Sequence, residues 1–82
     1  MRVQLLYFAA VRELVGRSEE DVTLGDEVRT IRALRQWLTA RNPALGARLG
    51  TVRFALDEEF VDDAAPLHEG AVVALIPPVA GG

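Results

Sequence analysis

Few side chains in this sequence of 82 residues could carry out chemistry on their own. Cysteine is absent, which excludes a disulfide, a thiolate metal site and a cysteine nucleophile. All nine basic residues are arginine, so no Schiff base or isopeptide bond can form through a lysine side chain. His68 is the only histidine and cannot by itself build a metal site or a histidine-centred triad. These exclusions argue against most small enzymes and favour a carrier or binding module.

The last two residues, Gly81 and Gly82, are the strongest candidates for function, because they follow an apolar strand and two prolines. The tail consists of Pro77, Pro78, Val79, Ala80, Gly81 and Gly82. The prolines favour an extended backbone, so the tail can reach ~20 Å beyond the folded body. Its small, uncharged residues could enter a narrow channel that a larger side chain would block. It would deliver the carboxylate of Gly82, which is a poor electrophile and needs activation, for example by adenylation. The alternative is a frayed chain end without function.

The other charged groups are better explained as solvated surface. Residues 57–63 hold five acids but lack the spacing and the glycine of a Ca²⁺-binding loop, which favours a solvated hairpin. His68 is expected in an exposed loop. Arg12 is expected to form a surface ion pair with the neighbouring Glu13, the alternative being that it steers an acidic partner. We therefore predict no metal site.

Hydrophobic periodicity predicts strands at both ends of the chain and one main helix between them. The expected strands are 2–8, 19–24, 52–56, 60–61 and 71–76, and a short helix at 9–15 is expected to end at Gly16. Residues 71–76 are apolar throughout and are expected at the centre of a sheet, whereas the acidic segment 19–24 fits an edge.

The main helix is predicted over residues 30–41. Ile31, Leu34 and Leu38 share one face of it, and either Thr30 or Asp26 is its N-cap. Its opposite, solvated side is expected to carry Arg29, Arg32 and Arg35, and Asn42-Pro43 ends it.

This order of elements predicts an α+β fold, in which a mixed sheet of about five strands packs on one main helix. A short extra helix follows the first strand. If the first and last strands pair, the result is a ubiquitin-like β-grasp. The β-grasp domain is expected to span residues 1–76 and the extended tail residues 77–82.

The charge and hydropathy of the chain limit its partners and its location. The formal net charge of −3 argues against nucleic acid as the main partner. No apolar run approaches the ~20 residues that a membrane span needs. We therefore expect a cytoplasmic protein that binds neither nucleic acid nor membrane.

Three stretches together resemble the small, sulfur-carrying subunit of molybdopterin synthase, the MoaD family. They are FAAVRELVG at 8–16, PLHEG at 66–70 and IPPVAGG at 76–82. The closing stretch is the most specific, because it combines an apolar strand, two prolines and Gly-Gly. The thiamine-pathway carrier ThiS shares the fold and the Gly-Gly ending, but it lacks the FAxxRE stretch and the paired prolines.

The resemblance implies a route for sulfur. An E1-like activating enzyme of the MoeB type would use ATP and Mg²⁺ to adenylate Gly82, and a sulfur donor would convert the adenylate to a thiocarboxylate. The tail would then insert into the large subunit, MoaE, which would supply the acid–base groups, and would donate sulfur to cyclic pyranopterin monophosphate in molybdenum cofactor biosynthesis. The chain itself would be no enzyme and would bind no cofactor tightly, and the synthase would be a heterotetramer.

A second implication concerns partner binding. Phe8 is expected on the outer face of the first strand, and Ile76 lies just before the prolines. If the first and last strands are adjacent, both residues could belong to one exposed apolar patch, with Phe60 nearby. The resemblance places the contact with the large subunit on these positions, while the alternative is that they cap a small core.

Three rival functions remain open. One is sulfur carriage for another pathway, such as thiamine synthesis or tRNA thiolation. Another is a protein-conjugating, ubiquitin-like modifier. The third is a ubiquitin-like interaction module in which Gly-Gly is incidental.

Overall fold

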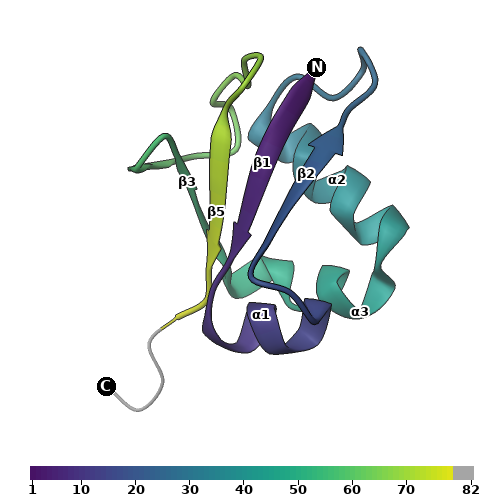
Figure 1. The fold of residues 1–82 in the computed structure, drawn as a ribbon, viewed down its shortest axis with the longest axis vertical. Helices are drawn as coiled ribbons and strands as arrows, with labels where there is room; N and C mark the ends of the chain where they lie inside the picture. The colour runs from purple at the N-terminus through teal and green to yellow at the C-terminus, as the bar shows by residue number, and fades with distance from the viewer. Residues whose placement is uncertain (79–82) are drawn as a thin grey trace.

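The computed structural model of this protein describes residues 1–78. Within this range, five strands form one mixed sheet in the order β2-β1-β5-β3-β4 (Figure 1). They are β1 (Arg2–Tyr7), β2 (Glu19–Thr23), β3 (Arg53–Leu56), β4 (Glu59–Val61) and β5 (Val72–Ile76). β1 and β5 are parallel neighbours, and the other pairs are antiparallel. The pairing of the first strand with the last confirms the predicted ubiquitin-like β-grasp.

Two predicted helices are present, with the expected caps. They are α1 (Ala9–Val15) and α2 (Ile31–Arg41). α1 ends at Gly16, whose φ of 88° is left-handed and is easily adopted without a Cβ. α2 begins after Thr30, whose hydroxyl oxygen accepts a hydrogen bond from the amide of Ala33 at 3.2 Å. Thr30, rather than Asp26, is therefore the N-cap.

Two short elements between α2 and β3 were not predicted. They are α3 (Pro43–Gly46) and the 3-10 helix η1 (Leu49–Thr51). The side chain of Asn42 accepts a hydrogen bond from the amide of Leu45, and Pro43 occupies the first turn. The pair Asn42-Pro43 thus ends one helix and starts the next, because proline is favoured at the first helical position. Leu45 and Leu49 are buried and close one end of the core.

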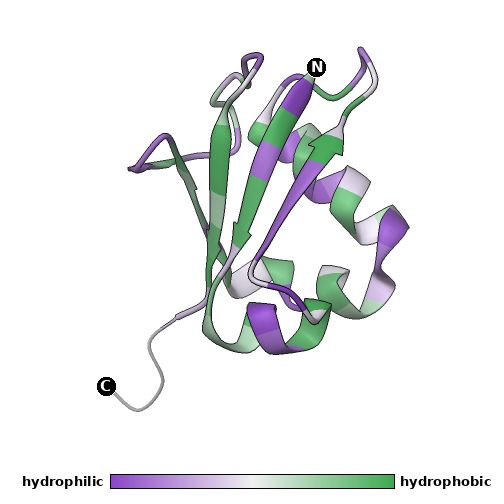
Figure 2. Ribbon diagram, in the orientation of Figure 1, coloured by the Kyte–Doolittle hydropathy of each residue, from purple (hydrophilic) through white to green (hydrophobic). Residues whose placement is uncertain are grey.

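The hydrophobic core lies between the sheet and α2. Its largest contributors are Leu5 and Tyr7 of β1, Phe54 of β3, Val73 and Leu75 of β5, and Ile31, Leu34 and Leu38 of α2. Figure 2 shows β5 as hydrophobic along its length and β2 as mostly hydrophilic, which fits their central and edge positions. Among the helices of residues 1–78, none has the length and apolar character that crossing a membrane requires.

Polar contacts join the β3–β4 turn to the start of β5. Asp57 (φ 49°) and Glu58 (φ 73°) form a tight left-handed turn. The Asp57 carboxylate accepts a hydrogen bond from the amide of Val72 at 3.0 Å, and its other oxygen lies 2.5 Å from Nε2 of His68. Nδ1 of His68 lies 2.9 Å from the carbonyl oxygen of Glu69. Because both ring nitrogens face acceptors, the imidazolium form is favoured, and the contact with Asp57 is the main cause that raises the pKa of His68.

We expect His68→Gln to lower the unfolding temperature at mildly acidic pH more than at alkaline pH. The pKa of folded His68 lies above its ordinary 6.5, so its stabilisation is complete below 6.5 and is lost as the pH rises through the folded-state value. The amide of Val72 and then His68 lower the pKa of Asp57 below 3.8. The Asp57 contribution is therefore present above 3.8 and is lost as the pH falls through the folded-state value. Thermal unfolding of both proteins across pH checks this, and a constant difference would contradict it.

Candidate functional site

The root of the tail lies in a groove at the end of β5. Pro77 is half-buried and Pro78 is exposed, and neither can donate a hydrogen bond that would continue the strand. The groove between α1 and η1 is lined by Ala10, Val11, Leu14, Arg48, Thr51, Val52, Pro77 and Pro78. The two prolines thus lie beside α1 and η1 where β5 ends. The other predicted tail residues, Val79, Ala80, Gly81 and Gly82, lie outside the described residues.

Phe8 stands on the face of the sheet that α2 does not cover. Its backbone is extended (φ −119°, ψ 150°), so it continues the alternation of β1 and points to the same side as Leu6. Ala9 follows with a φ of 48°, a left-handed conformation that turns the chain into α1. The Phe8 side chain is therefore 45% exposed.

Strand register brings Ile76 and Phe60 to the same face as Phe8. Tyr7 pairs with Leu75, which makes Phe8 and Ile76 the next positions along β1 and β5. Ile76 pairs with Arg53 of β3, whose guanidinium lies over the Phe60 ring at 3.8 Å from its centroid. The three residues predicted to contact a partner thus lie along one strip, and Arg53 joins Ile76 to Phe60.

A second row of small and apolar residues completes this surface. Leu6 pairs with Ala74, Ala74 pairs with Ala55, and Ala55 pairs with Phe60. We call the surface the outer face, and it consists of Leu6, Phe8, Arg53, Ala55, Phe60, Ala74 and Ile76. Phe60 is 53% exposed, more than any other large hydrophobic residue of the described range. An exposed apolar surface of this kind is typical of a protein-binding site.

Sequence reasoning missed Arg53, although the signal was present. In the segment VRFAL, alternation places Phe54 in the core and therefore Arg53 and Ala55 on the opposite face. The predicted ion pair between Arg12 and Glu13 was wrong, because Arg12 forms no ion pair with Glu13 within residues 1–78. Adjacent helical residues do not face each other, so the two side chains diverge.

The acidic segment 57–63 holds no metal-binding cluster. Within residues 1–78, no three His, Cys, Asp or Glu side chains converge in a way that could hold an ion. Asp57 contacts His68, Asp62 accepts a hydrogen bond from the amide of Ala64, and Asp63 pairs with Arg35. These carboxylates therefore serve the turn and the loop that follow β3.

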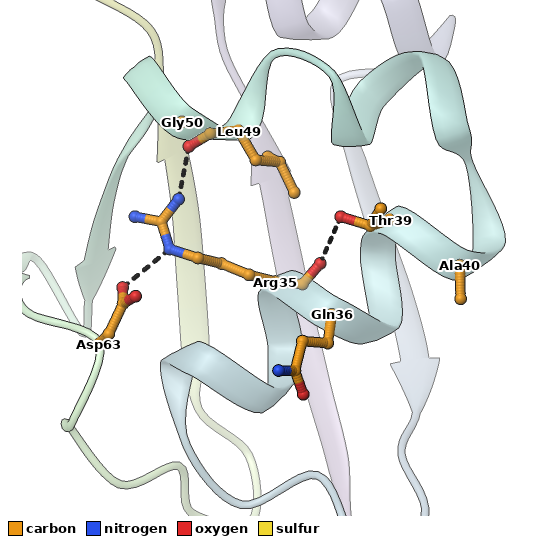
Figure 3. Close-up of a pocket in the computed structure, with 7 residues that line it drawn as sticks. All are labelled: Arg35, Gln36, Thr39, Ala40, Leu49, Gly50 and Asp63. Atoms are coloured by element: carbon orange, nitrogen blue, oxygen red, sulfur yellow. Dashed lines mark hydrogen bonds and ion pairs between the residues drawn. The ribbon is translucent and has the colours of Figure 1, made fainter.

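Arg35 is not part of a solvated face, contrary to the prediction for α2. Figure 3 shows its guanidinium between Asp63 and the backbone of η1. It donates to Asp63 at 2.8 Å, to the carbonyl of Leu49 at 2.5 Å and to that of Val52 at 3.2 Å, and it stacks over Phe54 at 4.4 Å. Arg35 lines the cavity drawn in Figure 3, but its guanidinium already donates to Asp63 and to two backbone carbonyls. We therefore assign Arg35 a structural role.

We expect Arg35→Ala to lower the free energy of unfolding by about 2–4 kcal/mol, because it leaves two carbonyls and a carboxylate without their donor. Arg32→Ala is the matched control, since Arg32 is an exposed residue of the same helix with no ion pair in the described range. It should cost less than about 0.5 kcal/mol. Urea unfolding measures both, and equal losses would refute a structural role for Arg35.

Known proteins resemble the chain over its full length. A curated relative from Chlamydomonas reinhardtii, a molybdopterin synthase sulfur carrier subunit, is 42% identical, and the match covers 100% of both chains. The protein of that name from Escherichia coli is 38% identical over 98% of this chain and 99% of its own length. Small archaeal modifier protein 3 from Haloferax volcanii is 30% identical over 100% of both chains.

Solved structures point the same way. A chain from the complex of subunits 1 and 2 of molybdopterin-converting factor from Helicobacter pylori superimposes with a TM-score of 0.72. It is 25% identical, and the match covers 100% of both chains. The ThiS family itself matches residues 5–82, which includes the outer face and the tail. The chain therefore belongs to the ThiS family, and its relatives there include the sulfur carrier subunits of molybdopterin synthase.

Proposed function

We propose that this chain is the sulfur-carrier subunit of a molybdopterin synthase and that it carries sulfur as a thiocarboxylate on Gly82. The full-length similarity to curated sulfur carrier subunits is the observation that carries the proposal. The composition supports it as well, because a chain without cysteine has no thiol on which sulfur could travel. The terminal carboxyl group remains as the attachment point.

The chemistry proceeds through an activated acyl group. A carboxylate oxygen of Gly82 attacks the α-phosphorus of ATP, held with Mg²⁺ by an E1-like, MoeB-type enzyme, and pyrophosphate leaves. Hydrosulfide, as the sulfur donor, then attacks the acyl carbon, the bond from that carbon to the AMP oxygen breaks, AMP and the hydrosulfide proton leave, and a thiocarboxylate remains. A thiocarboxylate is ionised at neutral pH and is a soft nucleophile, which suits attack on cyclic pyranopterin monophosphate.

The catalytic groups belong to the large subunit in this proposal. The groove at the tail root is lined by apolar residues with Arg48 and Thr51, a set without a carboxylate or imidazole for acid–base catalysis. The contribution of this chain is to hold a reactive group at high effective concentration in its partner's pocket. It is thus a carrier and a co-substrate and binds no cofactor tightly.

The outer face is the proposed docking surface for the large subunit, with Phe8, Phe60 and Ile76 as apolar anchors. The relative from Helicobacter pylori is found in a complex of subunits 1 and 2, which supports a two-subunit arrangement here. We further propose that two copies of each subunit form a heterotetramer and that the assembly works in the cytoplasm.

Intact-mass spectrometry tests sulfur carriage. The chain is incubated with its activating enzyme, ATP, Mg²⁺ and a sulfur donor. We expect the mass gain of one oxygen-to-sulfur exchange, which is absent when ATP is omitted. An unchanged mass would overturn the proposal.

Protein modification is the second candidate function, favoured by the similarity to small archaeal modifier protein 3. It predicts covalent conjugates between Gly82 and lysines of other proteins. A ladder of such conjugates, rather than a free thiocarboxylated chain, would favour the modifier. Adding lysine-containing target proteins to the same incubation, and measuring the masses of all chains, therefore separates the two functions.

A further inference from the structure

A cation stands within the otherwise apolar outer face. Arg53 begins β3, is exposed, and pairs with Ile76 on the neighbouring strand. Its guanidinium carbon lies 3.8 Å from the centre of the Phe60 ring, so the group is held flat on an aromatic face. The ring fixes the position of the charge between two of the proposed anchors.

This guanidinium has no anionic partner in residues 1–78. It takes part in no ion pair and in no side-chain hydrogen bond of the described range. Asp62, which follows β4 on the same edge, directs a carboxylate oxygen to the amide of Ala64 at 2.9 Å. Glu19 lies on β2, three strands away and hence at ~14 Å.

Covering the outer face has an electrostatic consequence. A partner that buries the Phe60 ring also removes water from the guanidinium stacked on it. Burying an arginine without acceptors is strongly unfavourable, whereas a carboxylate meets its planar donors with two parallel hydrogen bonds. A partner that covers the apolar anchors must therefore supply acceptors at this point, and a carboxylate is the acceptor that matches both the charge and the planar geometry of the guanidinium.

We propose that Arg53 selects the partner of the outer face, and that the covering surface places an aspartate or glutamate against its guanidinium. This inference rests on the proposed function, because it takes the large subunit as the partner. It adds a charge requirement to a contact that apolar anchors alone would leave non-specific.

The other edge of the sheet gives the contact a direction. Glu19 pairs with Leu6 and Asp21 with Gln4, so both acids flank the outer face on β2. From β2 to β3 the outer face therefore changes from acidic through apolar to basic, and β4 beyond them adds Phe60 and the exposed Asp62. A partner with a carboxylate opposite Arg53 and a neutral or basic side chain opposite β2 can dock in one orientation only.

Arg53→Glu and Arg53→Met test the inference in binding to the purified large subunit. We expect charge reversal to weaken binding by ~30-fold or more, and Arg53→Met, which keeps an unbranched stem over Phe60, to weaken it less. Arg29→Glu is the matched control, because Arg29 is exposed in the loop before α2 and its Nε donates only to the carbonyl of Asp26. It makes the same change in net charge and should alter binding by less than about 3-fold.

A second arm identifies the acid. Exposed aspartates and glutamates of the large subunit are reversed to lysine one at a time, and one reversal should restore binding to Arg53→Glu while weakening binding to the wild-type chain. Circular dichroism establishes that each variant is folded. If Arg53→Glu binds as wild type does, if it loses no more than Arg29→Glu, or if no reversal rescues it, the inference is wrong. Failure of the wild-type chain itself to bind would instead overturn the proposed function.

Discussion

A chain that ends at Ala80 is expected to acquire no sulfur, although it still folds and still binds the large subunit. The β-grasp is complete by Ile76, and within residues 1–78 the core contains no residue beyond Leu75. Removing Gly81 and Gly82 therefore leaves stability and the outer face unchanged. The truncation replaces the unhindered carboxylate of a glycine by that of Ala80, which carries a Cβ. It also brings the carboxylate two residues closer to the folded body, so that the carboxylate would not reach the end of a narrow channel in the activating enzyme.

Intact mass and product formation measure this effect, which should be a complete loss of both. Ala80→Gly is the matched control, because it alters the tail but keeps both terminal glycines, and it should retain sulfur transfer. Unfolding by urea should give the same midpoint for wild type and truncated chain. Sulfur on the shortened chain would show that Gly82 is not the attachment point.

Replacing Phe60 by alanine is expected to weaken binding of the large subunit by ~30-fold or more, and Phe8→Ala by a similar factor. Both rings are about half exposed and lie outside the buried core, so their loss removes contact area for a partner rather than core packing. The free energy of unfolding should change by less than about 1 kcal/mol. Phe60→Ala also removes the ring that positions Arg53.

Isothermal titration calorimetry with the isolated large subunit checks these values. Gln36→Ala provides the control, since Gln36 is exposed on α2, on the other side of the sheet from the outer face. We expect it to reduce affinity by less than about 5-fold. Equal losses for Gln36 and Phe60 would mean that the outer face is not the docking surface.

The sheet and the main helix could be predicted because they follow from local patterns. Apolar residues on both faces of 2–8 and an apolar run at 71–76 indicated two central strands, and they pair as β1 and β5. Phe8 and Ile76 follow from the same alternation, so their placement on one face was accessible from sequence. The Gly-Gly ending was recognisable from its context, an apolar strand followed by two prolines.

Arg35, which was misjudged, and Arg53, which was missed, show what sequence patterns leave out. Periodicity assigns Arg35 to the polar side of α2, but its long side chain reaches back over Phe54 to the carbonyls of η1. Arg53 was not singled out from sequence, because its stacking on Phe60 depends on the β3–β4 hairpin. In both cases a partner distant in sequence decides the role.

A similar polar network ties the edge strand to α2. The Tyr7 hydroxyl donates to Glu20 at 2.8 Å, and Glu20 also pairs with Arg41, which stacks over Trp37. Burial, followed by the hydrogen bond to Glu20, raises the pKa of Tyr7. These four residues come from three elements, and no local motif indicates that they meet.

Single-turnover sulfur transfer tests the central claim most directly. Chain that carries sulfur on Gly82 is mixed with the purified large subunit and cyclic pyranopterin monophosphate, and intact mass and product are followed together. The account predicts that the chain returns to its carboxylate mass as the dithiolene forms, with two thiocarboxylates consumed for each product molecule. Product formed while the chain keeps its sulfur, or sulfur lost with no product, would contradict it.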